Sequence, residues 1–271
     1  MDRYAVVGHP VSHSMSPRIH AAFARQTGQS LSYARLPAPR DGFPETVRGF
    51  IAAGGRGLNV TLPFKPEACE FVDSLSTRAS AARAVNTIIV EPDGTTTGDN
   101  TDGAGLLRDL VENNAIEITG KRVLVAGAGG AVRGVLQPLL LALPAELVVV
   151  NRTVARAREL REAFAATGDL EACGYDQLSG RRFDLVINGT STGIEETVPP
   201  LPENIFLPDG CAYDMFYASD VTAFVCWALD RGAGKALDGT GMLVEQAAES
   251  FWLWRGIRPE TAPVIDMLRE R

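Results

Sequence analysis

The sequence predicts an α/β protein with two domains, each built around a mainly parallel sheet. Short apolar segments typical of strands alternate with amphipathic segments typical of helices along most of the 271 residues. The pattern changes near Lys121, where a buried strand runs directly into a glycine-rich loop. Because strands that alternate with helices usually pair in parallel and are covered on both faces, we expect layered α/β units in both halves.

The composition excludes several classes of partner. With 45% hydrophobic and 22% charged residues, the chain is an ordinary globular protein with a sizeable core. The net charge of -7 is spread along the chain without a basic block, so we expect no nucleic acid partner. The apolar stretch around Leu139 is interrupted by Gln137 and Pro138 and is far shorter than the roughly 18 residues of a membrane span, so we expect no membrane partner.

The cysteines and the N-terminal segment indicate a cytoplasmic protein. The four cysteines form no C-x-x-C pair and are too few for a disulfide scaffold, so we expect reduced thiols. The opening segment, MDRYAVVGHP, does not resemble a signal peptide. No ligand pattern indicates a metal, and we expect none.

The first half predicts strands, helices and one hairpin. Ser16 is expected to cap a helix that has Pro17 at its first position and Gly28 at its end. Asp93 and Gly94 are typical of a hairpin turn. The expected elements are strands at 4–8, 31–37 and 57–64, a hairpin over 84–100, and helices over 16–28 and 103–115.

The second half repeats the alternation of strand and helix. An interior proline disrupts a helix by about 3 kcal/mol or more, so Pro138 predicts a short or bent helix after the glycine loop. The expected strands lie within 122–126, 146–153, 183–190 and 210–217, and an apolar helix is expected over 241–256.

The glycine-rich loop indicates a dinucleotide site. Gly127, Gly129 and Gly130 follow the strand at once, and such glycines let the backbone approach a pyrophosphate at a helix N-terminus. The fingerprint normally has a small residue at the position of Val132, so a simple tight turn stays a possible alternative.

The end of the next strand favours NADP over NAD. NAD-binding folds usually place an acidic residue there to bind the ribose 2′-hydroxyl. This chain has Asn151, Arg152 and Thr153 instead, with Arg156 one turn further on. Arginine binds a 2′-phosphate through charge-assisted bonds, although a solvated helix face would also contain these residues.

Polar residues also follow other strands. Thr190 and Ser191 come after a strand end, where open parallel sheets bind ligands, although any polar loop would look similar. In the first half, Ser14 and Ser16 lie beside a helix N-terminus, a favourable place for a carboxylate. Thr61, Lys65, Asn86 and Asp102 lie at further loops and helix starts, and each taken singly has an ordinary structural explanation.

The motifs taken together are specific enough to indicate one protein family. The chain contains, in order, HPVSHSMSPRIH, NVTLPFK, AVNT, GDNTDG, GAGGAVRG, NRTVARA, DMFY and DGTGMLVEQAA. In this order and spacing they resemble the shikimate dehydrogenase family over essentially the whole chain. Two details differ from that pattern: Ala223 follows Thr222 where proline is usual, and Gly189 replaces a more common alanine.

The resemblance implies the reversible, NADP-dependent reduction of 3-dehydroshikimate to shikimate, a step of aromatic amino acid biosynthesis. It also implies a substrate-binding domain at 1–103 completed by 238–271, and a Rossmann-like NADP-binding domain at 104–237, separated by a cleft. Lys65 and Asp102 would form the acid–base pair, since an ammonium can protonate and stabilise a forming alkoxide.

The remaining site residues follow from the same resemblance. The substrate carboxylate would bind Ser14 and Ser16, the ring hydroxyls would bind Thr61, Asn86 and Gln246, and Tyr217 would close the site. The expected cofactor contacts are Gly127, Ala128, Gly129, Gly130, Ala131, Asn151, Arg152, Thr153, Arg156, Thr190, Ser191, Gly239 and Met242.

The position of Gln246 independently indicates that its side-chain amide needs a hydrogen-bond partner. It lies near the apolar stripe of the last helix, and an unpaired buried amide costs about 1–3 kcal/mol, so it needs a partner. That partner would be a substrate hydroxyl or a neighbouring backbone group.

Three alternatives stay open. The first is a quinate or dual quinate/shikimate dehydrogenase, the second a folate or amino-acid dehydrogenase on a similar frame, and the third a non-enzymatic NADP-binding sensor. The chain could be a monomer or a homodimer.

Overall fold

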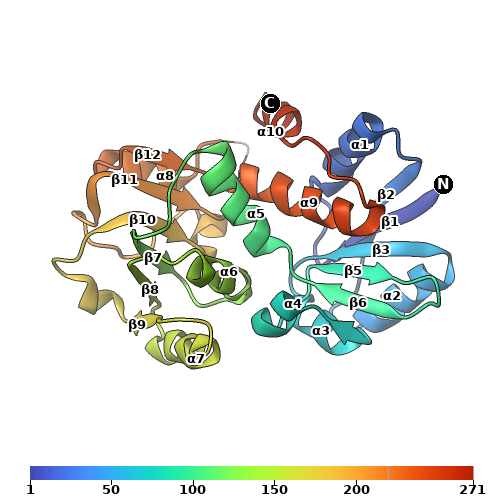
Figure 1. Cartoon of the computed structure of the whole chain (residues 1–271), viewed down its shortest axis with the longest axis horizontal. Helices are drawn as coiled ribbons and strands as arrows, with labels where there is room; N and C mark the ends of the chain where they lie inside the picture. The colour runs from blue at the N-terminus through green and yellow to red at the C-terminus, as the bar shows by residue number, and fades with distance from the viewer. Residues whose placement is uncertain (219, 271) are drawn as a thin grey trace. The chain divides into compact units, whose positions relative to one another are not determined.

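The computed structural model describes residues 1–218 and 220–270 and divides into two compact units (Figure 1). The first unit consists of Met1–Gly105 and Leu243–Glu270, and the second of Leu106–Met242. Among the described residues, each unit contains a six-stranded sheet. The two-unit α/β class that the sequence predicts is therefore confirmed.

The sheet of the first unit is mixed. Its strands are β1 (Asp2–Gly8), β2 (Leu31–Pro37), β3 (Gly55–Val60), β4 (Ser74–Leu75), β5 (Thr87–Val90) and β6 (Thr96–Asp99), in the order β2-β1-β3-β5-β6-β4. Strand β1 pairs in parallel with β2 and β3, whereas β5 pairs antiparallel with β3 and β6. The hairpin between β5 and β6 turns at Gly94, whose φ of 88° suits glycine and confirms the expected hairpin.

Helices cover both faces of this sheet. They are α1 (Ser16–Thr27), α2 (Phe43–Ala52), α3 (Lys65–Phe71), α4 (Thr77–Ala82), α9 (Thr240–Arg255) and α10 (Ala262–Arg269). Val7 and Leu58 pack with α2, α3 and α4 in one core. Helices α1, α9 and α10 form a second core, and Trp254 of α9 stacks on Tyr4 of β1 at 4.7 Å between ring centroids.

The start of α1 differs from the expectation. The helix already begins at Ser16, so its cap position is Met15 and Pro17 is the second helical residue. Met15 has helical backbone angles and its carbonyl accepts the Ile19 N–H at 3.1 Å, which moves the first turn one residue earlier. Gly28 ends the helix in the left-handed conformation, as expected.

Strand β3 also ends earlier than expected. It stops at Val60, and a turn over 61–64 leads into α3, so Lys65 is the first residue of a helix and lies beyond the strand end. The turn is held by the Thr61 N–H, which donates to the Val7 carbonyl at 2.9 Å. This hydrogen bond, four residues before Lys65, therefore attaches the start of α3 to the end of the sheet.

The sheet of the second unit is parallel throughout its described pairs. Its strands are β7 (Arg122–Ala126), β8 (Glu146–Val150), β9 (Glu171–Cys173), β10 (Phe183–Asn188), β11 (Phe206–Asp214) and β12 (Lys235–Leu237), in the order β12-β11-β10-β7-β8-β9. This is the doubly wound order of dinucleotide-binding folds, and its direction reverses between β7 and β10. Ligands of such sheets bind at that reversal.

The helices of the second unit are α6 (Gly130–Leu141), α7 (Val154–Phe164) and α8 (Ala223–Asp230), with short 3-10 turns at Tyr175–Leu178 and Ser191–Glu195. Helix α5 (Asp102–Arg108) leads into this unit and continues as a π-helix over Asp109–Asn113. The sequence predicts a short or bent helix after the glycine loop. The short form is wrong, because α6 has 12 residues and runs three residues past Pro138, and a bend stays a prediction. Val135, Leu136 and Leu139 of α6 are buried, and this packing outweighs the local propensity.

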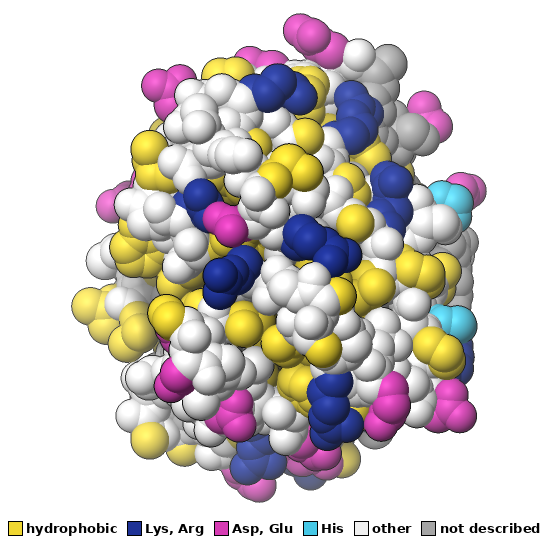
Figure 2. All heavy atoms as spheres, turned by 90° about the vertical axis from the view of Figure 1, so that its right-hand side faces the viewer, with side chains coloured by type: hydrophobic (Ala, Val, Ile, Leu, Met, Phe, Trp, Pro, Cys, Tyr) yellow, Lys and Arg dark blue, Asp and Glu magenta, His cyan; other side chains and the backbone are white. Residues whose placement is uncertain are grey.

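The surface carries mixed charge. On the face drawn in Figure 2, Lys and Arg side chains are interspersed with Asp and Glu. The four cysteines are free thiols. Within 1–218 and 220–270, no helix is both long and apolar enough to cross a membrane.

Candidate active site

Lys65 and Asp102 form a short ion pair. The Nζ of Lys65 lies 2.5 Å from Oδ2 of Asp102, and the side chains are only 17% and 8% exposed. Lys65 opens α3 and Asp102 opens α5, so two helix starts bring together residues from separate motifs. Removing charges from water strengthens their attraction, so the pair holds the Lys65 ammonium against the Asp102 carboxylate.

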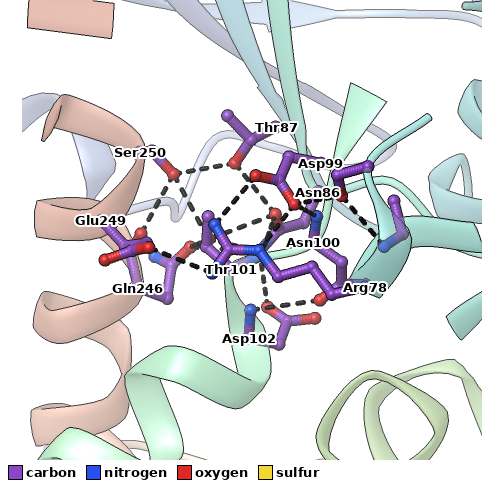
Figure 3. Close-up of polar contacts among 12 residues, drawn as sticks. Arg78, Asn86, Thr87, Asp99, Asn100, Thr101, Asp102, Gln246, Glu249 and Ser250 are labelled. Atoms are coloured by element: carbon purple, nitrogen blue, oxygen red, sulfur yellow. Dashed lines mark hydrogen bonds and ion pairs between the residues drawn. The ribbon is translucent and has the colours of Figure 1, made fainter. Parts of the chain in front are cut away.

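Asn86 holds the other oxygen of Asp102. Its Nδ2 donates to Asp102 Oδ1 at 2.8 Å, and its own Oδ1 accepts the Thr101 N–H at 2.9 Å (Figure 3). Asn86 is 2% exposed, so its amide is set by protein partners on both sides. Each carboxylate oxygen of Asp102 therefore has a fixed donor: Lys65 for one and Asn86 for the other.

Gln246 finds its partner within its own helix. Its Nε2 donates to the Leu243 carbonyl at 2.8 Å, and its Oε1 lies 3.4 Å from Asn86 Nδ2. The neighbouring backbone group, one of the two partners considered for this amide, is thus present. The need for a partner consequently gives no independent evidence for a substrate contact at Gln246. Its side chain nevertheless lies next to Asn86 and Thr101, as Figure 3 shows.

A buried polar network behind Asn86 was not predicted from the sequence. Thr87 Oγ1 lies 2.8 Å from Ser250 Oγ, and Asn59 Nδ2 donates to Ser250 Oγ at 2.9 Å. Asn59 Oδ1 accepts the hydroxyl of Tyr33 at 2.7 Å. The available signal was the polar residue Asn59 between Leu58 and Val60, together with Ser250 one turn after Gln246.

The two serines lie together at the start of α1. Ser14 Oγ donates to Ser16 Oγ at 3.2 Å, and the carbonyl of Ser14 accepts two bonds from the Arg35 guanidinium. Ser16 is buried and Ser14 is half-buried. Thr61 is half-buried in the turn that leads to Lys65. A pair of hydroxyls at a helix N-terminus is a suitable anion site.

The glycine loop lies at the reversal of the second sheet. Gly127 has a φ of 109°, and a Cβ there would lie 2.9 Å from the Gly189 carbonyl, so this position requires glycine. Gly129 precedes α6 with no side-chain cap, and the helix starts at Gly130. Gly129, Gly130 and Ala131 are exposed, whereas Ala128 is half-buried. Uncapped N–H groups beside an open glycine loop fit a pyrophosphate.

The large residue at position 132 and the glycine at position 189 are structurally coupled. Val132 is fully buried, and a Cβ on Gly189 would overlap its Cγ2 and lie 3.0 Å from the Met215 sulfur. The large residue in the fingerprint is accommodated because Gly189 has no side chain. The departures that the sequence shows at these two positions are therefore one compensating pair.

The end of β8 is basic and open. Arg152, Thr153 and Arg156 are exposed, and Asn151 Nδ2 donates to the Thr153 carbonyl at 2.9 Å. Helix α7 starts at Val154 without a side-chain cap. Two guanidinium groups at an uncapped helix start, with no acid at 151–153, fit a 2′-phosphate.

The remaining residues that the sequence predicts as site residues lie in the second unit. The Thr190 hydroxyl bonds to Asn188 Oδ1 at 2.7 Å, while Ser191 is exposed and Tyr217 is half-buried. A Cβ on Gly239 would lie 2.5 Å from the Met215 carbonyl, so the backbones approach closely there. Met242 is 8% exposed.

The second unit, with its doubly wound sheet and a glycine loop at the reversal of strand order, places the chain among the dinucleotide-binding α/β proteins. Family models match three segments of the chain: "Shikimate dehydrogenase substrate binding domain" at residues 6–88, "Shikimate / quinate 5-dehydrogenase" at 109–198, and "Shikimate 5'-dehydrogenase C-terminal domain" at 239–269.

Individual relatives are similar to this chain over nearly its full length. "Shikimate dehydrogenase (NADP(+))" of Thioalkalivibrio sulfidiphilus is 56% identical, covering 99% of this chain and 98% of its own. An Ael1 enzyme from Pseudomonas putida has a similar crystal structure (TM-score 0.93, 44% identity, 99% and 98% coverage). So does shikimate 5-dehydrogenase from Thermus thermophilus, solved with NADP(H) and shikimate (TM-score 0.89, 36% identity, 100% and 99% coverage). The chain belongs to the shikimate dehydrogenase family.

Proposed function

We propose that this chain catalyses the reversible, NADP-dependent reduction of 3-dehydroshikimate to shikimate. The observation that carries the proposal is the 2.5 Å pair between Lys65 and Asp102, an ammonium held against a fixed carboxylate. The names of the relatives support the substrate and the cofactor, since those that are more than half identical are called NADP-dependent shikimate dehydrogenases.

Lys65 is the proton donor in this mechanism. NADPH, when bound, supplies the hydride that reduces the ketone. The Lys65 ammonium donates a proton to the ketone oxygen as it becomes a hydroxyl, and its charge stabilises the negative charge that develops there. Asp102 aims the ammonium, and Asn86 keeps the carboxylate from turning. In the reverse direction, neutral Lys65 accepts the hydroxyl proton.

The substrate groups are assigned to the first unit, Met1–Gly105 with Leu243–Glu270, which corresponds to the expected substrate-binding domain at 1–103 with 238–271. Ser14 and Ser16 bind the carboxylate at the start of α1, where the helix dipole favours an anion. Thr61, Asn86 and Gln246 are assigned to the ring hydroxyls, and Tyr217 is assigned a further substrate contact.

The cofactor is assigned to the second unit, Leu106–Met242, which corresponds to the expected NADP-binding domain at 104–237. The loop from Gly127 to Ala131 holds the pyrophosphate. Arg152 and Arg156, with Asn151 and Thr153, hold the 2′-phosphate. Further contacts come from Thr190, Ser191, Gly239 and Met242.

The experiment is to follow NADPH absorbance with 3-dehydroshikimate for the wild type and for Lys65→Ala. Loss of the proton donor should lower kcat by about 10²–10⁴-fold, with a much smaller change in shikimate affinity, because the lysine acts mainly in the transition state. Lys121→Ala is the matched control, since Lys121 is a surface lysine of the second unit that pairs with Glu117. A Lys65→Ala variant that lost affinity but kept kcat would contradict the proposal.

Absorbance measured in the oxidising direction, with shikimate or quinate as the alcohol and with NADP or NAD as the oxidant, tests substrate and cofactor specificity. We expect the ratio kcat/KM to be highest for shikimate with NADP. We further propose that the protein works in the cytoplasm as a monomer or homodimer, and sedimentation of the purified chain distinguishes these two states.

A further inference from the structure

An arginine outside the proposed acid–base pair clamps the segment that carries Asp102. Arg78 on α4 donates from Nε and Nη2 to the two oxygens of Asp99, at 2.7 and 2.8 Å. Its Nη1 donates to Glu249 of α9 at 3.0 Å. One planar guanidinium thus joins the end of β6 to α9, as Figure 3 shows.

The first arm of this clamp leads to the backbone of Asp102. Asp99 Oδ1 also accepts the Asn100 N–H at 2.7 Å and the Ser76 hydroxyl at 2.5 Å. Asn100 Oδ1 in turn accepts the Asp102 N–H at 3.1 Å, and Asn100 Nδ2 donates to the Ala84 carbonyl. Hydrogen bonds therefore connect Arg78 to the backbone of Asp102 through two intervening residues.

The second arm leads to α9. Glu249 lies next to Ser250 and three residues after Gln246, on the helix that contacts the Asn86 network. Its other oxygen accepts a bond from Arg258 at 2.6 Å. Arg78 consequently holds α9 and the Asp99–Asp102 segment at a fixed separation.

Both carboxylates depend on arginine for their charge. Burial alone would raise the pKa of Asp99, but the bonds from Arg78 and Ser76 outweigh it and lower the pKa. The pKa of Glu249 is likewise lowered by Arg258 and Arg78 against the effect of burial. Without Arg78, Asp99 would be a buried carboxylate that has lost the guanidinium bonded to both of its oxygens, and the segment would have to rearrange to hydrate it.

We propose that Arg78 is a positioning residue for the reaction: through Asp99 and Glu249 it fixes the Asp99–Asp102 segment so that the Asp102 carboxylate meets the Lys65 ammonium. Arg78 does not touch the reacting atoms in this assignment. The inference rests on the proposed function, since its effect on turnover acts through the Lys65–Asp102 pair.

Arg258 provides a matched control. The side chains of Arg78 and Arg258 are 27% and 26% exposed and both bond to Glu249, but only Arg78 bonds to Asp99. We expect Arg78→Met to lower kcat by about 10–100-fold with a small change in the KM for shikimate, since a misplacement of about 1 Å can lower turnover by about 10²-fold. Arg258→Met should lower the thermal midpoint comparably and leave kcat within about twofold.

The conservative variant separates charge from geometry. Arg78→Lys keeps the charge but cannot bond to both oxygens of Asp99, so its kcat should lie between those of the wild type and Arg78→Met. Should Arg78→Met fail to fold, Arg78→Lys and Asp99→Asn serve in its place. Equal kcat values for the position-78 and position-258 variants would overturn the proposal.

A double-mutant cycle tests the route of the effect. If Arg78 acts through Asp102, Arg78→Met should lower kcat far less in an Asp102→Asn background than in the wild type. The same fold-change in both backgrounds would overturn the proposed route.

A crystal structure of Arg78→Met gives a readout that does not depend on turnover. We expect the Lys65–Asp102 distance to lengthen in it, and an unchanged pair would overturn the positioning role. Failure of the wild type to turn over 3-dehydroshikimate would instead refute the proposed function alone, so the two failures are distinguishable.

Discussion

The hydroxyl of Tyr213 donates to Oδ2 of Asp109 at 2.7 Å and accepts the backbone N–H of Met242 at 3.3 Å. Tyr213 is fully buried, and burial together with the Asp109 charge raises its pKa well above the ordinary value, so the phenol stays protonated. Met242 is in the first turn of α9, where N–H groups lack helical partners. A Cβ on Gly241 would overlap the Asp109 carboxylate, so these groups interlock.

Replacing Tyr213 with phenylalanine should loosen the start of α9. The Met242 N–H loses its acceptor and Asp109 loses one of its donors, and an unpaired buried N–H costs about 1–3 kcal/mol. We expect urea unfolding to show a loss of this size and cofactor titration to show weaker NADP binding. Unchanged stability and NADP affinity would mean that the phenol does not support this turn.

Gly189→Ala should be destabilising because of Val132. The added methyl group meets the Cγ2 of Val132, and overpacking a core typically costs about 1–3 kcal/mol. In a Val132→Ala background the same change should be much better tolerated, with a coupling energy of about 1 kcal/mol or more from thermal or urea unfolding. Strictly additive effects would refute the compensation.

Local patterns in the sequence predicted part of the fold. The parallel sheet of the second unit and the hairpin at Gly94 follow from such patterns, whereas the meeting of Lys65 with Asp102 was expected from the family resemblance and from no local pattern. Strands β9 and β12 are only three residues each, which is too short for a period to be visible.

Other features depend on tertiary context that no local pattern contains. The π-helix over Asp109–Asn113 is one such feature, since its sequence resembles an ordinary helix. The partner of the Gln246 amide depends on rotamer choice within α9. The clamp by Arg78 joins three segments, and a single arginine in a short helix gives no sign of them.

Ala223→Pro should stabilise the protein. Ala223 is the first residue of α8, where proline fits and where no helical N–H bond is lost. Thr222 has extended backbone angles (φ -68°, ψ 152°), which a residue before proline prefers. We expect a gain of about 0.4–1 kcal/mol in the free energy of unfolding, with kcat unchanged. A loss of stability would show that the turn cannot accept the ring.

His20 should make stability depend on pH. It is fully buried, its ring stacks on Tyr33 at 4.2 Å, and burial lowers its pKa from 6.5 to about 3. Between these values the unfolded chain binds a proton that the native state does not, so stability falls as the pH is lowered. The slope approaches about 1.4 kcal/mol per pH unit.

His20→Phe should remove that slope while keeping an aromatic ring in the stack. The unfolding free energies of the wild type and His20→Phe should be compared between about pH 4.5 and 6.5, below the unfolded pKa of histidine. Asp99 and Glu249 have lowered pKa values, and their own contribution is lost only as the pH falls below the unfolded values of 3.8 and 4.5. Urea unfolding at several pH values measures the slope, and identical slopes for both proteins would contradict this origin.

Arg152→Asp should shift cofactor preference towards NAD. A carboxylate repels the 2′-phosphate, and each charge-assisted bond lost is worth about 1.5–3 kcal/mol, or about 10–100-fold in the ratio of kcat/KM for NADP and NAD. Arg158→Asp is the control, because Arg158 is also exposed on α7. Equal ratios in both variants would argue against a phosphate contact at Arg152.

The first unit is completed by residues from both ends of the chain. Ile19 and Phe23 of α1 pack against Val244 and Phe251 of α9, and all four are fully buried. During translation, the ribosome synthesises the whole of the second unit before it makes those partners. The apolar face of α1 therefore stays without its α9 partners in the nascent chain while the second unit is made, and this is the interval in which a chaperone would be needed.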